Sequence, residues 1–173
     1  VWLGGGFLNA AGNPHVMRAA SIPGMERVGV LLLVLGGGSA LGTWWVNTRG
    51  RAFPHALLLG GGLLIVSAGL AVFALSTLFA VFAGAAFLIG VAAAPAYVLS
   101  ETLLQEGTEP RQRGRVFSAR DFVMRLVFVA GGTAAGFLTR SAGTRAALLA
   151  CGGLIAAAGI AALAWGRRMP RSA

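Results

Sequence analysis

The stretch ALLLGGGLLIVSAGLAVFALSTLFAVFAGAAFLIGVAAAPAYVLS, from Ala56 to Ser100, contains no charged residue over 45 positions. A helix crosses the hydrocarbon core of a bilayer with about 20 apolar residues, so this stretch is long enough to cross twice. Ser76 and Thr77 form its polar break, where a tight turn fits between two spans. We therefore predict a helical hairpin, 56–75 and 78–100, in an all-α integral membrane protein.

The composition agrees with a chain surrounded by lipid, because 57% of the residues are hydrophobic and only 11% are charged. A net charge of +9 would suggest nucleic acid as the partner of a soluble protein. Here the arginines fall between apolar segments, where they set orientation in a membrane, and we expect no nucleic-acid partner. The lone Cys151 excludes a disulfide within the chain, and we expect no metal and no cofactor. His15 and His55 fall in polar connectors, and we expect both at the surface.

Further apolar segments predict a bundle of helices. The opening run VWLGGGFLNA is too short to cross and follows no basic n-region, so we interpret it as the end of a helix that begins upstream. The chain is then a fragment. Three more segments are long enough to cross, and four polar stretches connect the elements: spans at 28–46, 118–138 and 146–165, with connectors at 11–27, 47–55, 101–120 and 139–145.

The positions of the arginines predict the orientation of the bundle. If the helices alternate in direction, nine arginines fall on one side, in 47–55, 101–120 and the C-terminal tail. Only Arg18, Arg27, Arg140 and Arg145 fall on the other side. Because arginine collects in cytoplasmic loops, we place the two basic loops and the C-terminus in the cytoplasm.

Small residues and one proline indicate how the helices meet. Gly38-x-x-x-Gly42 and Gly132-x-x-x-Gly136 have the spacing that lets two membrane helices approach closely. Pro95 removes a backbone hydrogen bond within the span 78–100, and we expect it to kink that helix. The kink is either part of a moving pathway or a passive feature of packing.

The segment TLLQEGTEPRQRGRVFSARDFVMRLVF, Thr102–Phe128, resembles a loop of the major facilitator superfamily. Leu103-Leu104-Gln105 and Arg113-Gly114-Arg115-Val116-Phe117 are similar to the loop between helices 10 and 11 in the branch that contains macrolide efflux pumps and the enterobactin exporter. The resemblance covers about residues 22–166. It implies that the chain is part of the C-terminal six-helix half of a twelve-helix transporter, with the end of helix 7 followed by helices 8 to 12. It also implies a bacterial plasma (inner) membrane.

A second superfamily motif, G-x-x-x-D-R-x-G-R-R, fits less closely. Its degenerate copy would run from Thr43 to Ala52, where Gly50-Arg51 matches the Gly-Arg of the motif. Asn47 stands at the position of the aspartate, so we do not expect a charge relay here. What remains is a glycine turn with two positive anchors, Arg49 and Arg51.

The charges around 101–125 are candidates for a cytoplasmic gate. Asp121 and Arg125 lie four residues apart, so they share one helix face and can form a pair. Either the pair exchanges partners with Arg120 as a cavity opens, or it is a static anchor of the helix end. Glu101 can meet Arg49 or Arg115 across this face or act as a solvated cap. Arg113 belongs to the same candidate group.

The resemblance implies that helices 7, 8, 10 and 11 face a central cavity. The residues it brings to that cavity are Asn9, Phe87, Tyr97, Met124 and Phe128. Such an apolar, aromatic wall suits hydrophobic drugs or siderophores, and it also suits plain helix packing. Protons are a candidate coupling ion, but no carboxylate lies between Val28 and Ser100, so a titrating residue is expected in the missing N-terminal half.

The sequence contains no catalytic motif. It also contains no phosphate-binding loop, because the glycine triplets at 36–38 and 60–62 lack the Lys and Ser or Thr of a P-loop. We expect a transporter that works by alternating access, rather than an enzyme. The alternative is a small multi-span membrane protein with a structural or assembly role. Six further spans upstream would decide for the transporter.

Overall fold

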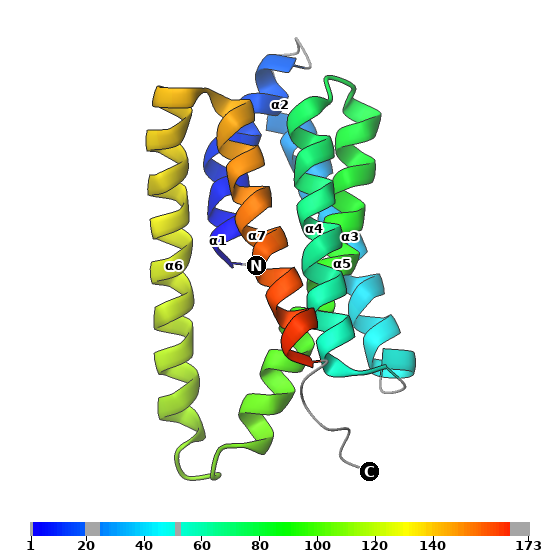
Figure 1. Cartoon of the computed structure of the whole chain (residues 1–173), viewed down its shortest axis with the longest axis vertical. Coiled ribbons are helices and arrows are strands. Elements are labelled where there is room, and N and C mark those ends of the chain that lie inside the picture. The colour runs from blue at the N-terminus through cyan, green and yellow to red at the C-terminus, as the bar shows by residue number, and fades with distance from the viewer. Residues whose placement is uncertain (1, 20–24, 51–52, 167–173) are drawn as a thin grey trace.

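The computed structural model describes residues 2–19, 25–50 and 53–166, and these residues form helices and connections without a β-strand. The elements, in chain order, are α1 (Trp2–Phe7), the π-helix η1 (Leu8–Gly12), α2 (Asn13–Ala19), α3 (Met25–Arg49), α4 (His55–Leu75), α5 (Phe79–Glu106), α6 (Arg113–Ala142) and α7 (Thr144–Gly166) (Figure 1). The five helices α3 to α7 are long and apolar enough to cross a membrane.

The predicted hairpin of 56–75 and 78–100 is confirmed as a pair of packed helices. α4 ends at Leu75, and the backbone N–H of Ser76 donates to the carbonyl of Val72 to close its last turn. The hydroxyl of Ser76 then accepts a hydrogen bond of 3.1 Å from the N–H of Leu78. The polar break therefore stabilises the turn through both its backbone and its side chain.

The polar connectors are shorter than predicted. α5 continues to Glu106 and α6 begins at Arg113, so most of the stretch 101–120 is helical. The prediction was wrong here because apolarity marks only the part of a helix that suits hydrocarbon. Polar turns such as those around Arg120 continue the same helix beyond it.

The connector predicted at 11–27 was also wrong in its first half. The chain stays helical from Trp2 to Ala19, with the π-helical turn η1 in the middle. This helix buries Ala11 and Val16, and His15 with them, at 8% exposed. The prediction that His15 lies at the surface was wrong, because the polar residues around it do not indicate a buried helix face. His55 is exposed as expected.

The bundle consists of two sets of three helices, and helices of one set pack against helices of the other. α3 packs along α5, α6 packs along α1, and α4 packs along α7. Taking α1, α3 and α4 as one set and α5, α6 and α7 as the other, the counterparts in chain order are α1 and α5, α3 and α6, and α4 and α7. The contact of α3 with α5 then corresponds to the contact of α1 with α6, and α4 packs on its own counterpart, α7. Each helix of the second set runs opposite to its counterpart in the first (Figure 1). This is the geometry of an inverted repeat.

Glycines at the crossings show the same repeat at atomic detail. A Cβ on Gly38 of α3 would strike the carbonyl of Phe87, and one on Gly90 of α5 would strike the carbonyl of Leu35. Gly38 thus faces the carbonyl three residues before Gly90, and Gly90 faces the carbonyl three residues before Gly38. Gly131 of α6 and Gly6 of α1 repeat the pattern on the carbonyls of Leu3 and Phe128. Without side chains at these positions the backbones come into direct contact.

The pair α4 and α7 crosses in a similar way. A Cβ on Gly60 would lie 2.8 Å from the carbonyl oxygen of Gly159, and one on Gly159 would lie 3.0 Å from that of Gly60. The hydroxyl of Ser67 also donates a hydrogen bond of 2.8 Å to the carbonyl of Gly152. All three of these packed helix pairs therefore cross at glycines.

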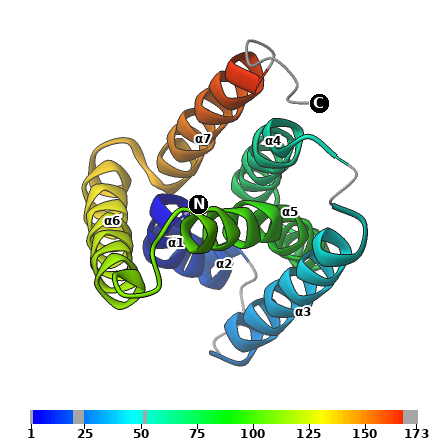
Figure 2. The same cartoon turned by 90° about the horizontal axis from the view of Figure 1, so that it is seen from below.

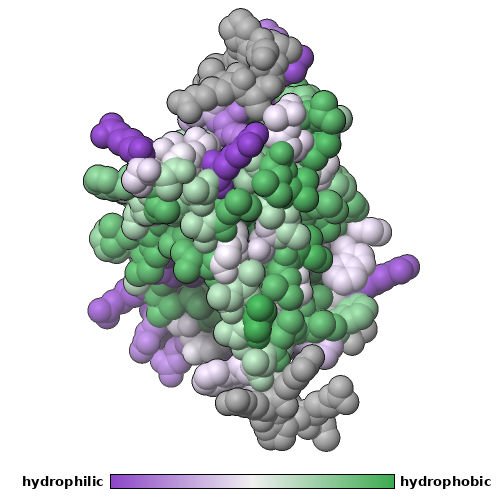
Figure 3. Space-filling model, turned by 45° about the horizontal axis from the view of Figure 1, so that its top comes forward, coloured by the Kyte–Doolittle hydropathy of each residue, from purple (hydrophilic) through white to green (hydrophobic). Residues whose placement is uncertain are grey.

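Two apolar helices have little cover from the rest of the chain. In their most apolar stretches only 11% of the residues of α6 and 22% of those of α3 are buried, against 33 to 44% in α4, α5 and α7. α3 and α6 stand at the two edges of one face, with α1 and α2 between them, and α4 and α7 lie on the other side (Figure 2). Apolar residues cover most of the molecular surface seen in Figure 3. Such a surface requires lipid or a partner to cover it.

Candidate functional site

A largely buried polar contact joins the end of α5 to the start of α6. The guanidinium of Arg120 forms an ion pair with the carboxylate of Glu101, and its Nη2 donates a hydrogen bond of 3.3 Å to the hydroxyl of Ser100. The same guanidinium lies over the ring of Tyr97, 5.6 Å from its centroid. We call Tyr97, Ser100, Glu101 and Arg120 the α5–α6 junction. The side chain of Arg120 is only 10% exposed and that of Glu101 is 23% exposed, so breaking this pair leaves a largely buried charge.

Pro95 lies within α5, six residues before Glu101 of this junction. The C-terminal part of α5 runs toward α6, as Figure 1 shows. Proline has no N–H, so the carbonyl of Val91 loses its intrahelical donor. Gly42 of α3 fits directly against this carbonyl, and any Cβ there would collide with it. The predicted proline site therefore lies inside an unbroken helix, buried, and matched by a glycine on its neighbour.

Arg113, one of the predicted gate and loop residues, contacts the backbone at the end of α5. Its Nε donates to the carbonyl of Thr108 at 3.4 Å, and its Nη2 donates to that of Gln105 at 3.3 Å. These carbonyls belong to the end of α5 and the turn after it, where a positive charge is favourable. Arg113 thus holds the connection 107–112 against the helix that it follows.

The inverted repeat relates Arg120 to an arginine at the other end of the bundle. Arg27 in α3 and Arg120 in α6 each lie 11 residues before the reciprocal glycine of their helix, Gly38 and Gly131. The guanidinium of Arg27 lies over the ring of Phe79, 5.0 Å from its centroid, at the start of α5. Two equivalent arginines therefore hold α5 at its two ends, each on an aromatic ring. Sequence spacing alone did not indicate this relation, because it appears only once the glycine crossings align the two sets.

The predicted pair of Asp121 and Arg125 is not formed. Both side chains are exposed, and the ion pair present in the described residues is that of Arg120 with Glu101. Asp121 and Arg125 lie in one helix, as the spacing of four residues predicted. The arginine that is buried is Arg120, and it pairs with Glu101 of α5. The partner of Glu101 is accordingly neither Arg49 nor Arg115.

The other predicted loop residues are dispersed. Asn47 and Arg49 are exposed in the last turn of α3, and Arg115 is exposed near the start of α6. Arg51 lies outside the described residues. Gly50, which follows α3, is buried, and a Cβ there would lie 3.1 Å from the side chain of Val46.

The five predicted cavity residues lie on three elements. Asn9 is exposed in the π-helical turn η1, and Phe87 and Tyr97 are 37% and 49% exposed on α5. Met124 and Phe128 are half-buried on α6, where the ring of Phe128 packs against Gly5 of α1. None of the five lines the space of about 140 Å³ between α1, η1, α3, α4 and α5. Tyr97 is the one residue of this set that belongs to the α5–α6 junction, through its contact with Arg120.

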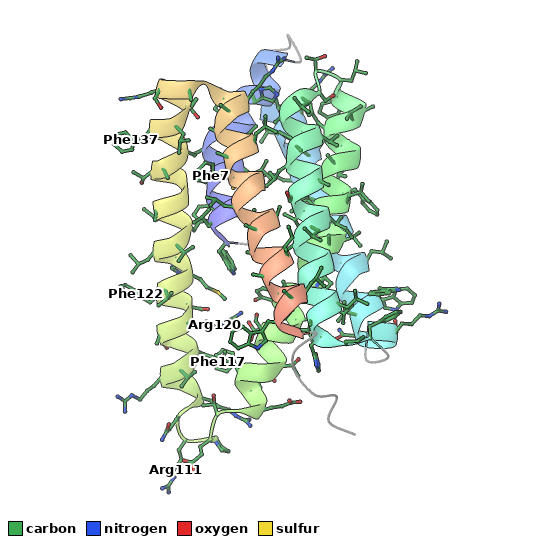
Figure 4. The ribbon with its side chains drawn as sticks, in the orientation of Figure 1. Phe7, Arg111, Phe117, Arg120, Phe122 and Phe137 are labelled. Carbon is green, nitrogen blue, oxygen red and sulfur yellow. The ribbon has the colours of Figure 1, made fainter. Side chains whose placement is uncertain are left out.

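Figure 4 separates the two faces of α6. Arg120 and Phe117 lie on the side of α6 toward α5, whereas Phe122 and Phe137 project away from the bundle. Phe122 is 64% exposed and Phe137 is 70% exposed. One face of α6 therefore belongs to the junction, and the opposite face is an uncovered apolar surface.

An aromatic cluster at the other end of the bundle was missed. The imidazole of His15 lies edge-on to the ring of Phe82 at 5.8 Å between centroids, and Phe82 lies 4.7 Å from Phe73. In the sequence, only the apolar residues Ala11 and Val16 indicated that a helix continues here with a buried face. The polar residues between them made this face hard to recognise.

Compared with known protein families, curated proteins and solved structures, the chain matches none of them. The described residues also contain no group of three His, Cys, Asp or Glu side chains placed to hold a metal ion. The geometry of the bundle is thus the basis for a functional proposal.

Proposed function

We propose that this chain is part of the C-terminal half of a major facilitator superfamily transporter that exports a drug-like or siderophore-like compound by alternating access. The observation that carries the proposal is the inverted repeat of three helices. Each six-helix half of these transporters consists of two such inverted sets. The reciprocal glycine contacts of Gly38 with Gly90, and of Gly131 with Gly6, support the same arrangement here.

The uncovered helices support a missing partner half. α3 and α6 are counterparts in the repeat, and both leave their apolar sides open at the edges of one face. A second six-helix unit that rocks against this face would cover both edges at once. In this proposal the partner is the N-terminal half of the same polypeptide, in a bacterial plasma membrane, with the basic loops and the C-terminus in the cytoplasm.

The α5–α6 junction is the proposed cytoplasmic gate. It lies beside the connection 107–112, on the side to which the arginine distribution assigns the cytoplasm. A largely buried ion pair on two helices that are only partly packed can be exchanged for contacts with the partner half. Because the equilibrium between two transporter states spans a few kcal/mol, loss of one such pair is enough to shift it.

The substrate surface proposed here is apolar with few polar groups. Tyr97 and Phe87 supply exposed aromatic area on α5, and Asn9 supplies an amide from the π-helical turn. Single π-helical turns occur frequently at functional sites, because they place a side chain outside the regular helical register. This chemistry suits a hydrophobic compound held by one or two hydrogen bonds.

Flux measurements on the longer polypeptide test the proposal. Vesicles that contain it are loaded with a hydrophobic fluorescent compound or with a ferric siderophore, and the proton and substrate gradients are varied separately. We expect flux driven by one of these gradients, and reduced flux for Arg120→Gln at equal protein content. Vesicles whose flux equals that of protein-free vesicles for both compound classes would contradict the proposal.

A further inference from the structure

α3 and α4 lie on the side of the bundle away from α6 (Figure 2). An apolar groove lies between them. It has a volume of about 510 Å³. Its lining includes the exposed apolar side chains of Trp44, Leu57, Ile65 and Leu88, together with the buried Ala92 and Pro95 of α5. The volume is in the range of about 300 to 1,000 Å³ that is typical of small-molecule sites, so it fits one extended ligand rather than a further helix.

The groove exists because α4 presents glycines at its centre. Gly61 and Gly62 both line it. A Cβ on Gly62 would lie 2.6 Å from the carbonyl oxygen of Ala92, so this glycine brings α4 close to α5. A Cβ on Gly61 would meet nothing within 4 Å. Gly61 therefore leaves open a space that a larger side chain could fill without a clash.

One end of the groove has the chemistry of the membrane–water interface. Trp44 and Trp45 lie there, and Trp45 stacks on Phe53 with 5.7 Å between ring centroids. Tryptophan is enriched at the level of lipid headgroups. Arg49 follows Trp45 by four residues, so both lie on one face of α3. Arg49 is exposed and forms no ion pair within the described part of the chain.

We propose that this groove binds a single anionic phospholipid, with one acyl chain along α5 and the phosphodiester at Arg49. The all-apolar lining suits the hydrocarbon, and the charge at the tryptophan end complements the headgroup. A zwitterionic lipid would fill the same hydrocarbon space without a net attraction to Arg49. The proposal requires only that the helices lie in a bilayer, and it does not depend on transport.

A photoactivatable phosphatidylglycerol, with a diazirine in its acyl chain, tests the proposal in membranes that contain the protein. After illumination, labelled peptides are mapped by mass spectrometry. We expect adducts on Trp44, Leu57 and Leu88 to exceed those on the exposed apolar residues of α7, Leu154 and Ile160, by about fivefold. The same diazirine in phosphatidylcholine should show no such excess. Equal labelling of both surfaces, or equal excess with both lipids, would overturn the proposal.

Two pairs of variants locate the site. Gly61→Leu fills the groove and should reduce the excess to the level of α7. Gly153→Leu is its control, because a Cβ on Gly153 also meets nothing within 4 Å but lies on α7. Arg49→Gln should remove the preference for the anionic lipid, whereas Arg145→Gln, at an exposed position near the start of α7, should keep it. Unchanged labelling in Gly61→Leu or unchanged preference in Arg49→Gln, in protein that elutes as the parent does, would contradict the assignment.

Discussion

At the scale of single residues, the bundle depends on positions where a side chain is absent. Gly38, Gly90, Gly6 and Gly131 each face a backbone carbonyl of the neighbouring helix. Other glycines of the same helices face open space, among them Gly37 and Gly84. Glycine in a helix interior is destabilising by about 0.5 to 1 kcal/mol relative to alanine, so only the first group has a packing reason to be kept.

Two glycines of α5 give a matched test of this distinction. Gly90→Ala places a methyl group against the backbone of α3 and should lower the free energy of unfolding by about 1 to 3 kcal/mol. Gly84→Ala meets nothing and should leave it unchanged or raise it by up to about 1 kcal/mol. Thermal unfolding in detergent measures both. If the two variants unfold at the same temperature, the crossing is not as close as described.

The α5–α6 junction makes a second prediction at this scale. Arg120→Gln and Glu101→Gln should each change transport per inserted molecule severalfold, because each leaves the partner charge largely buried. The double variant should lose no more than the worse single variant, since both remove one interaction.

Controls come from the neighbouring charges. Asp121→Asn and Arg125→Gln affect exposed side chains and should keep the parental turnover. If Asp121→Asn reduced turnover as much as Glu101→Gln, the gate would lie on the other face of α6.

At the scale of elements, α5 contains Pro95 and, further along the helix, the residues that it contributes to the α5–α6 junction. Much of this level could be predicted from the chain, because apolar length and polar breaks determine where helices form in a hydrophobic segment. The hairpin around Ser76 follows from that rule. The burial of His15 and the pairing of Arg120 with Glu101 do not, because both depend on which helices become neighbours, and neither apolarity nor spacing encodes that.

Pro95→Ala should restore the hydrogen bond to the carbonyl of Val91 and straighten α5. The distance between spin labels at Gln105 and Ser141, both exposed, should then change and broaden relative to the parent protein. Labels at Leu75 and Ser141 are the control, since both lie outside the part of the chain that follows the kink, and their distance should stay the same. An unchanged Gln105–Ser141 distance would mean that packing, and not the proline, sets the bend.

At the scale of the whole molecule, the inverted repeat places the loops on two sides. The end of α3 and the connection 107–112 lie at one end of the bundle, and the turn between α6 and α7 lies at the other (Figure 1). For the sequence this alternation of the spans was an assumption, and the arginine distribution then predicted which end faces the cytoplasm. The sequence could not indicate the reciprocal glycine contacts, because glycine is abundant along the entire chain, with 27 copies.

Single cysteines report the orientation, in a background from which Cys151 is removed. Cysteines at Thr48 and Gly107 should resist an impermeant thiol reagent in intact cells, because we assign their end of the bundle to the cytoplasm. A cysteine at Ser141, exposed at the opposite end, should react readily. The reverse pattern would invert the topology, and reaction at all three positions would contradict a bundle that spans the bilayer.

The central claim is that this bundle is one half of a transporter and works only against a second half. The direct measurement is substrate flux into vesicles that contain the purified chain alone, and into vesicles in which it is combined with the proposed N-terminal half. We predict no flux above protein-free vesicles for the chain alone and gradient-driven flux for the combination. Flux by the chain alone, or no flux with both halves present and folded, would contradict the account.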